Sequence, residues 1–208
     1  MDFYDVIDKR RTIRDFTDEN IPIDVIKRII EAAFKAPTND HMRDWEYIII
    51  KDKEVIKKAL KTVPNGISDK DMDALIKDWN LNDELQQACY REAVPKQYKM
   101  FIDANIVIIP LLKEKVDIMH PQELGHLNGF ASIWCSIENL LLAATNEGYG
   151  CSLRIPRDNE PEVLKETLNI PDGYFIPCIL GMGKMDATKP TNKQKEIDIN
   201  SRIHYNKF

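Results

Sequence analysis

The sequence is poor in the motifs that mark metal centres, disulfide frameworks and dinucleotide-binding domains. Its four cysteines and four histidines are scattered over 208 residues, with no C-x-x-C or H-E-x-x-H spacing. Its eight glycines never form a G-x-G-x-x-G turn after an apolar strand. We therefore expect no metal, no structural disulfide and no Rossmann domain, and we expect reduced thiols in a cytoplasmic protein.

Long hydrophobic runs and an excess of basic charge are also missing. The most apolar segments, residues 106–112 and 140–144, are far shorter than the roughly 20 residues that span a bilayer. The first residues, MDFYDVIDKRR, lack the apolar centre of an export signal. A net charge of −5, from 29 basic and 34 acidic residues, disfavours general binding to nucleic acid. We expect no membrane span, no export signal and no nucleic-acid partner.

What the sequence does contain is the material for a core of helices and strands. Hydrophobic residues make up 43% of it and charged residues 30%, an ordinary globular balance. Helical spacing of apolar residues predicts helices at 3–9, 22–34, 122–147 and 161–168. Apolar runs predict buried strands at 46–51, 105–112 and 174–182. Because helices and strands interleave, we expect a sheet between layers of helices.

Two segments stand apart from this core. Residues 63–100 are polar and predict two helices, near 69–79 and 83–90. They form either a lid or a plain solvated pair of helices, and the pattern leaves both open. We predict one domain, residues 1–208, with this helical excursion and a C-terminal arm at about 184–208.

Two features predict a homodimer. The predicted helix 122–147 carries apolar residues on more than one face, which suits a core or a subunit interface, and Gly148 ends it. In the tail, Ile197, Ile199 and Ile203 alternate at even spacing, as in a short strand that needs a partner sheet. We expect the helix in a symmetric interface and the tail crossing to the other subunit.

A basic run closes the first predicted helix, at Arg10-Arg11-Thr12-Ile13-Arg14. Guanidinium groups bind phosphate through paired hydrogen bonds, and a hydroxyl can add one more. The same cations can instead complement the dipole at the helix C-terminus. Taken alone, the run is compatible with both roles.

A polar loop separates the second predicted helix from the first predicted strand, with the sequence Ala36-Pro37-Thr38-Asn39-Asp40-His41-Met42-Arg43-Asp44-Trp45. Short polar side chains in such a loop can meet the edge of a flat heteroaromatic ligand. The alternative is an ordinary turn with Trp45 as a core anchor.

Taken together and in this order, RRTIRDF and APTNDHMRDW resemble the opening of the nitroreductase family of flavoproteins. That pattern runs RRSxRxF, an amphipathic helix, and then APSxxNxQPW. The resemblance continues through the long helix and Gly148-Tyr149-Gly150, the strand at 174–183, and the basic segment from Lys189 to Lys195. It implies an α+β nitroreductase-like fold, with a mostly antiparallel sheet sandwiched by helices. It also implies a long central helix in a dimer interface, with two FMN sites there.

The resemblance implies that the basic run and the arm hold the FMN phosphate. Arg10, Thr12 and either Lys193 or Lys195 would contact it, with Arg11 beside them. Only one phosphate-sized basic cluster is present, and no second nucleotide signature accompanies it. We therefore expect FMN rather than FAD.

The resemblance also implies two contacts with the isoalloxazine ring. Arg14 would reach the pyrimidine edge, where its charge stabilises the reduced flavin. The segment Arg154-Ile155 would lie over the ring and offer a backbone N–H to flavin N5. Pro156 has no N–H to offer there.

The loop after the second helix would complete the flavin site. Three of its residues would line the ring or the ribityl chain: Pro37, Thr38 and Asn39. His41 and Arg43 stand where the family commonly has Asn and Gln, and Asp44 stands where it has Pro. We expect His41 and Arg43 to contact FMN and Asp44 to pair with Arg43. These departures bear on the substrate more than on the cofactor.

The activity implied is that of a ping-pong oxidoreductase. NADH or NADPH passes a hydride to flavin N5 and leaves, and an electron-poor small molecule, such as a nitroaromatic or a quinone, takes its place. No side chain need act as general acid or base, because the protein supplies orientation and electrostatics. Two alternatives stay open on the same scaffold. One is another FMN reaction, namely dehalogenation, ring reduction or flavin breakdown; the other is a non-enzymatic flavin-binding sensor.

Overall fold

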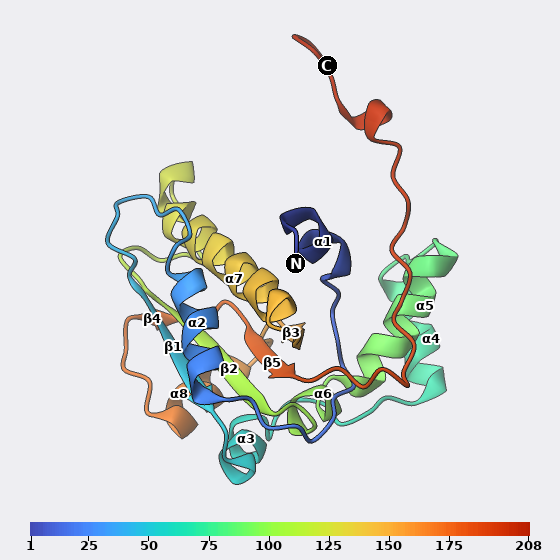
Figure 1. Cartoon of the computed structure of the whole chain (residues 1–208), viewed down its shortest axis with the longest axis horizontal. Coiled ribbons are helices and arrows are strands. Elements are labelled where there is room, and N and C mark those ends of the chain that lie inside the picture. Colours follow the sequence, from blue (N-terminus) through green and yellow to red (C-terminus); the bar gives the residue numbers. More distant parts are fainter.

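The computed structural model describes residues 1–208 as an antiparallel sheet with helices on both faces (Figure 1). The five strands are β1 (Trp45–Ile50), β2 (Ile106–Lys113), β3 (Gly150–Arg154), β4 (Tyr174–Phe175) and β5 (Ile179–Gly183). Their order is β1-β2-β5-β3, with β4 beside β2, and every pair is antiparallel. The predicted α+β fold, with its sheet between helices, is confirmed.

β2 is apolar almost throughout because both of its faces are covered. Ile106 and Ile108 join the core beneath α2 (Ile23–Ala33) and α7 (Asn128–Asn146). Val107 and Ile109 point to the opposite face, where the core includes residues of α3 (Lys53–Ala59) and α8 (Glu160–Leu168). Burying each of these side chains contributes about 1.5–3 kcal/mol before entropy is counted.

The long helix starts later than the sequence predicts. It was expected at 122–147, but α7 begins at Asn128 and the chain before it, Leu124–Leu127, forms a 3₁₀ turn. Gly125 lies in that stretch and disfavours an α-helix by about 1 kcal/mol relative to alanine. Gly148, with φ of 84°, follows the helix end as predicted.

The predicted strand 174–182 is split into β4 and β5. Pro177 lies between the two pieces and has no N–H to donate to a neighbouring strand. The sequence patterns did not predict β3, α3 or the short helix at Lys99–Ile102. The signal for α3 was present, since the Asp52 carboxylate caps it by accepting from the N–H groups of Glu54 and Val55.

The other helices are α1 (Phe3–Lys9), α4 (Asp69–Asp78), α5 (Glu84–Ala93) and the short α6 (Lys99–Ile102). The two helices predicted within 63–100 are therefore confirmed as α4 and α5. They share a small core of their own, made of Met72, Ile76 and Leu81. Both lie to one side of the sheet (Figure 1).

The C-terminal arm runs along α5 and then leaves the body of the molecule (Figure 1). Its end forms a 3₁₀ turn at Ile199–Arg202, so the predicted short strand is wrong for this chain. No sheet lies beside it in the chain, and Ile197 and Ile199 are each 60% exposed. None of the helices has the length and apolarity needed to cross a membrane.

Candidate functional site

The basic run is positioned by β3. Thr12 forms a parallel bridge with Cys151, and the N–H of Ile13 donates to the Cys151 carbonyl at 2.8 Å. The Ile13 side chain is buried against Gly150, where an added Cβ would lie 2.5 Å from Ile13 Cγ1. Because alternate residues of an extended segment point to opposite sides, Thr12 and Arg14 share the other side. Gly150 thus allows the run to lie close to the sheet.

The start of the C-terminal arm is fixed beside the same segment. The N–H of Thr17 donates to Lys184, the N–H of Asp186 donates to Asp15, and Phe16 bridges Met185. These contacts direct the following residues, 192–195, back over the basic run.

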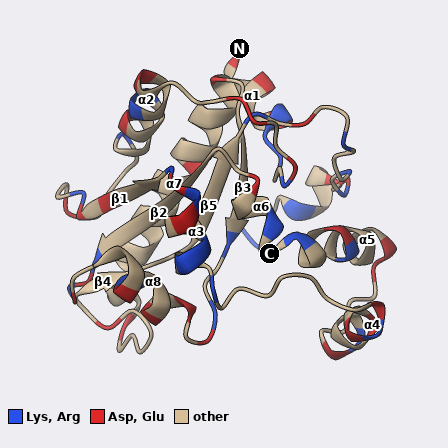
Figure 2. Cartoon of the chain, turned by 90° about the horizontal axis from the view of Figure 1, so that it is seen from below, with Lys and Arg blue, Asp and Glu red and all other residues tan.

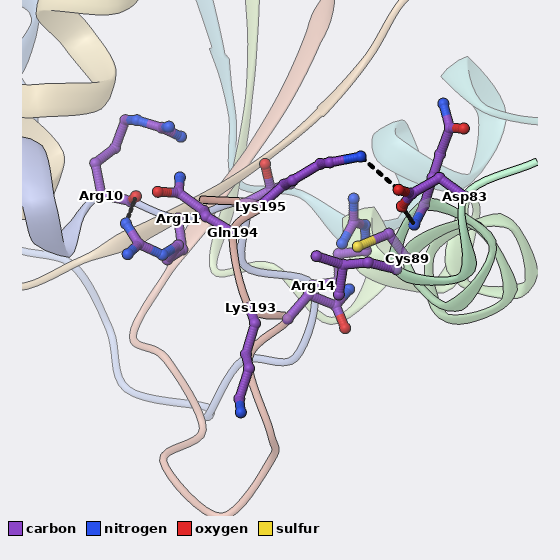
Figure 3. Close-up of a pocket in the computed structure, with 12 residues that line it drawn as sticks. Arg10, Arg11, Arg14, Asp83, Cys89, Lys193, Gln194 and Lys195 are labelled. Atoms are coloured by element: carbon purple, nitrogen blue, oxygen red, sulfur yellow. Dashed lines mark hydrogen bonds and ion pairs between the residues drawn. The ribbon is translucent and has the colours of Figure 1, made fainter. Parts of the chain in front are cut away.

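The run and the arm enclose a cavity of about 530 Å³ together with α5 (Figure 3). Six residues predicted to bind FMN line it together: Arg10, Arg11, Thr12, Arg14, Lys193 and Lys195. The Lys195 ammonium donates to Asp83, the N-cap of α5, and lowers the pKa of that carboxyl below its usual value. Lys193 forms no ion pair.

Arg14 sits in a network of charges behind this cavity. Its guanidinium donates to Glu92 at 2.9 Å, and Glu92 also contacts Lys96, which reaches Asp15 at 2.6 Å. Partial burial opposes the charge on Lys96, but its bonds to Asp15 and Glu92 raise its pKa overall. The Nε of Arg14 is buried without a hydrogen-bond partner. Arg14 therefore keeps one donor unused at the site.

A second cavity, of about 600 Å³, adjoins the first and also has Arg14 in its wall. Arg154 and Ile155 line it, as does α5. The Arg154 guanidinium is held by the buried Glu160 carboxylate, with Nε to Oε2 at 3.0 Å, and by Gln97 at 2.8 Å. The backbone N–H of Ile155, just beyond β3, donates to no acceptor in the chain.

The polar loop after α2 lies elsewhere. Thr38 and Asn39 line a separate, smaller cavity of about 150 Å³, and the Asn39 N–H donates to Ser132 Oγ. Within one chain, these residues do not join the basic run. The loop that carries them lies on the opposite side of α7 from the C-terminal arm (Figure 1).

The remaining loop residues are turned toward the loop itself. Pro37 and His41 are exposed, and Arg43 donates to the carbonyls of Phe34 and His41. The expected pairing of Asp44 with Arg43 is wrong, because Asp44 pairs with Lys115 at 2.6 Å. Lys115 also pairs with Asp40, so one ammonium group holds both carboxylates.

Sequence reasoning missed the contribution of α5 and of the polar arm residues. Asp83, Gln86, Cys89, Asn192 and Gln194 also line the first cavity. No motif marked them, because they belong to a polar stretch that folds back from outside the sheet. Basic and acidic residues are interspersed over the fold (Figure 2), so the cations of the cavity form a local cluster rather than a basic face.

Comparison with known proteins bears on the whole chain. The model of the Nitroreductase family matches residues 7–184. The iodotyrosine deiodinase of Nematostella vectensis is 37% identical over 212 residues, which cover 95% of this chain and 73% of that protein.

Two solved structures show the same fold. Oxidized iodotyrosine deiodinase bound to FMN and 3-iodo-L-tyrosine has a TM-score of 0.71 at 21% identity, covering 99% of this chain and 100% of that chain. An FMN-dependent nitroreductase from Clostridium difficile R20291 has a TM-score of 0.69 at 19% identity, covering 98% of each chain. The resemblance of the two N-terminal motifs is confirmed over most of the sequence, and this chain belongs to the nitroreductase family.

Proposed function

We propose that the chain is an FMN-dependent oxidoreductase that uses NADH or NADPH to reduce an electron-poor acceptor, such as a nitroaromatic or a quinone. The observation that carries this proposal is the cavity in which the basic run meets the arm. Bound FMN would supply the redox chemistry, taking a hydride at N5 and returning two electrons to the acceptor.

The cavity suits the phosphate end of FMN. Arg10, Thr12 and Lys193 offer two cations and a hydroxyl from segments more than 180 residues apart in sequence. Lys193 is free of carboxylates, whereas Lys195 is held by Asp83. Lys193 is therefore our choice of phosphate ligand between the two lysines, with Arg11 adding charge beside it.

The ring end is served by Arg14 and by the chain beyond β3. The buried, unpartnered Nε of Arg14 supports an acceptor at this point, such as the polar edge of a flavin ring. The unused N–H of Ile155 is a second donor, suited to N5. Glu92 fixes the Arg14 guanidinium in place, and Glu160 does the same for Arg154.

The loop with Thr38, Asn39, His41 and Arg43 completes this site only in a homodimer. In one chain it lines a different cavity from the basic run, so a second copy must bring its loop to the flavin. We propose that this happens across a symmetric interface containing α7.

The exposed tail supports the same assembly. Ile197, Ile199 and Ile203 are unpaired in the chain, while β1 is an edge strand. Beside β1 lies an apolar groove of about 530 Å³ lined mainly by isoleucines and aromatic residues of α2 and β1. The tail of a second copy would cover this groove with its three isoleucines.

The proposal is tested on the purified protein after reconstitution with FMN. We expect FMN in the denatured supernatant, a dimer by light scattering, and steady NAD(P)H oxidation only when a nitroaromatic or quinone is present. FAD as the main flavin, or no binding of FMN at all, would refute the cofactor assignment. FMN binding without NAD(P)H oxidation would instead favour a sensor.

Reductive dehalogenation is the second candidate, favoured by the 37% identity with an iodotyrosine deiodinase. The same site would hold a halogenated phenol in place of the nitroaromatic. Measuring iodide release from 3-iodo-L-tyrosine and nitro-group loss from a nitroaromatic under identical reducing conditions separates the two. Faster iodide release would make dehalogenation the main activity.

A further inference from the structure

The second cavity has an aromatic and aliphatic lining. Trp79 and Tyr90 pack edge to face, with ring centroids 5.5 Å apart and planes at 89°. Aliphatic side chains from three parts of the chain complete the wall: Ile67, Leu75, Val94, Leu153 and Ile155. Trp79 and Ile155 are about half exposed, at 45% and 51%, so apolar surface stays open to a ligand.

The charged groups of this cavity are all positive. Arg14, Arg154 and Arg157 are its ionisable cations, and no aspartate or glutamate lines it. Arg14 is neutralised by Glu92, and Arg154 by Glu160. Arg157 makes no ion pair and no side-chain hydrogen bond, and its guanidinium lies 5.9 Å from the centre of the Trp79 ring. Arg157 is thus an uncompensated cation held at an aromatic wall.

The cavity is also in the right place for an acceptor. Arg157 follows Ile155 by two residues, and Ile155 carries the N–H that we assign to flavin N5. A molecule that takes electrons from N5 must lie close to that segment. Arg14, which faces the other end of the proposed ring, lines both cavities.

We propose that this cavity binds the acceptor, and that the acceptor is a flat aromatic molecule carrying an acidic group. Its ring lies against Trp79, Tyr90 and Ile155, and its carboxylate or phenolate accepts hydrogen bonds from the Arg157 guanidinium. Arg157 is then the residue that selects acidic acceptors over neutral ones. This inference rests on the proposed function, because it assigns the substrate class of the same site.

A matched pair of probes tests the charge preference without turnover. 4-Nitrobenzoate and 4-nitrobenzamide have the same ring and nearly the same shape, but only the first is an anion. Titration calorimetry on the oxidised, FMN-loaded protein should show the anion binding about tenfold more tightly, the scale of one hydrogen bond between charged groups. Equal affinities for the two probes would overturn the proposal.

Variants assign the preference to a residue. Arg157→Gln should remove the preference while leaving the amide affinity within about twofold, and Arg157→Lys should retain part of it. Arg91→Gln is the matched control, because Arg91 is exposed, pairs with Asp73 and lines neither cavity. An unchanged preference in Arg157→Gln, or an equal loss in Arg91→Gln, would contradict the assignment.

Turnover gives the second readout. Reduction of 4-nitrobenzoate by NAD(P)H consumes one proton and yields the nitroso acid, NAD(P)⁺ and water. The ratio of kcat/KM for anion over amide should follow the binding ratio in each variant. Turnover of both probes with equal kcat/KM would refute the acidic-acceptor inference while sustaining the oxidoreductase. Absence of turnover would refute the proposed function, and the titration would still decide whether the cavity selects acids.

Discussion

Gly150→Ala should separate the basic run from the sheet. An added Cβ would lie 2.5 Å from Ile13 Cγ1 and 2.7 Å from Ile13 Cβ. These atoms are at the base of a buried side chain, so a change of rotamer cannot relieve the contact. Restoring an ordinary contact of 3.4 Å requires the backbone around Ile13 to move by about 0.9 Å. Thr12 and Arg14, on either side, must move with it.

The expected cost has two parts. Overpacking a core contact destabilises a protein by about 1–3 kcal/mol, which lowers the Tm of a chain of this size by about 2–12 °C. Displacement of a binding group on the order of 1 Å can reduce a rate by about a hundredfold. We therefore expect Gly150→Ala to bind FMN at least about tenfold more weakly and to accept electrons from NAD(P)H more slowly.

Differential scanning fluorimetry and FMN titration measure these two effects. Gly129→Ala is the matched control for stability, because its Cβ would meet Leu112 side-chain carbons at an ordinary 3.7 Å. The same substitution there should leave the Tm unchanged or raise it, since alanine favours a helix. A Gly150→Ala variant with wild-type Tm and wild-type FMN affinity would refute the role assigned to the close contact with Ile13.

Three further predictions concern the flavin edge, the cysteines and the tail. Arg14→Ala should lower the flavin midpoint potential and slow flavin reduction about ten- to a hundredfold. Arg10→Ala should mainly weaken FMN retention. An unchanged potential in Arg14→Ala would mean that Arg14 does not contact the flavin ring. Burial raises the pKa of the Cys151 thiol to about 12, so at pH 8 only about one thiol in ten thousand is ionised. Iodoacetamide should label Cys151 at least about a hundredfold more slowly in the folded protein than in the unfolded chain, with labelling rising as the pH rises; equal rates at pH 8 would contradict the burial. Ile199→Asp should shift the protein toward monomer in light scattering, and an equally stable dimer would remove the tail from the interface.

Much of the fold could be predicted because its core elements carry clear local signals. α2 has apolar residues at helical spacing, and β2 is a short apolar run rich in β-branched residues. β3 was missed because Gly150-Cys151-Ser152 lacks the β-branched residues that mark a strand. Its place is set by pairing with β5 and by Ile13, contacts that no local pattern contains.

The basic half of the candidate site could be predicted, and the acidic groups around it could not. Arg10, Thr12 and Arg14 are adjacent in sequence, so one motif contained them. Glu92 and Asp83 reach the same place through the fold of α5, which tertiary contacts determine. The proposed contribution of the polar loop from a second copy is equally invisible to local patterns, because it would depend on contacts between two chains.

Anaerobic reduction of the FMN-loaded protein by NADH and by NADPH tests the central claim most directly. Loss of the flavin's visible absorbance in a stopped-flow instrument reports each transfer without any choice of acceptor. We predict complete bleaching by at least one of the two donors at one equivalent per bound FMN, and slower bleaching in Arg14→Ala. Protein that binds FMN but stays oxidised with both donors would contradict the claim that this chain is an NAD(P)H-dependent oxidoreductase.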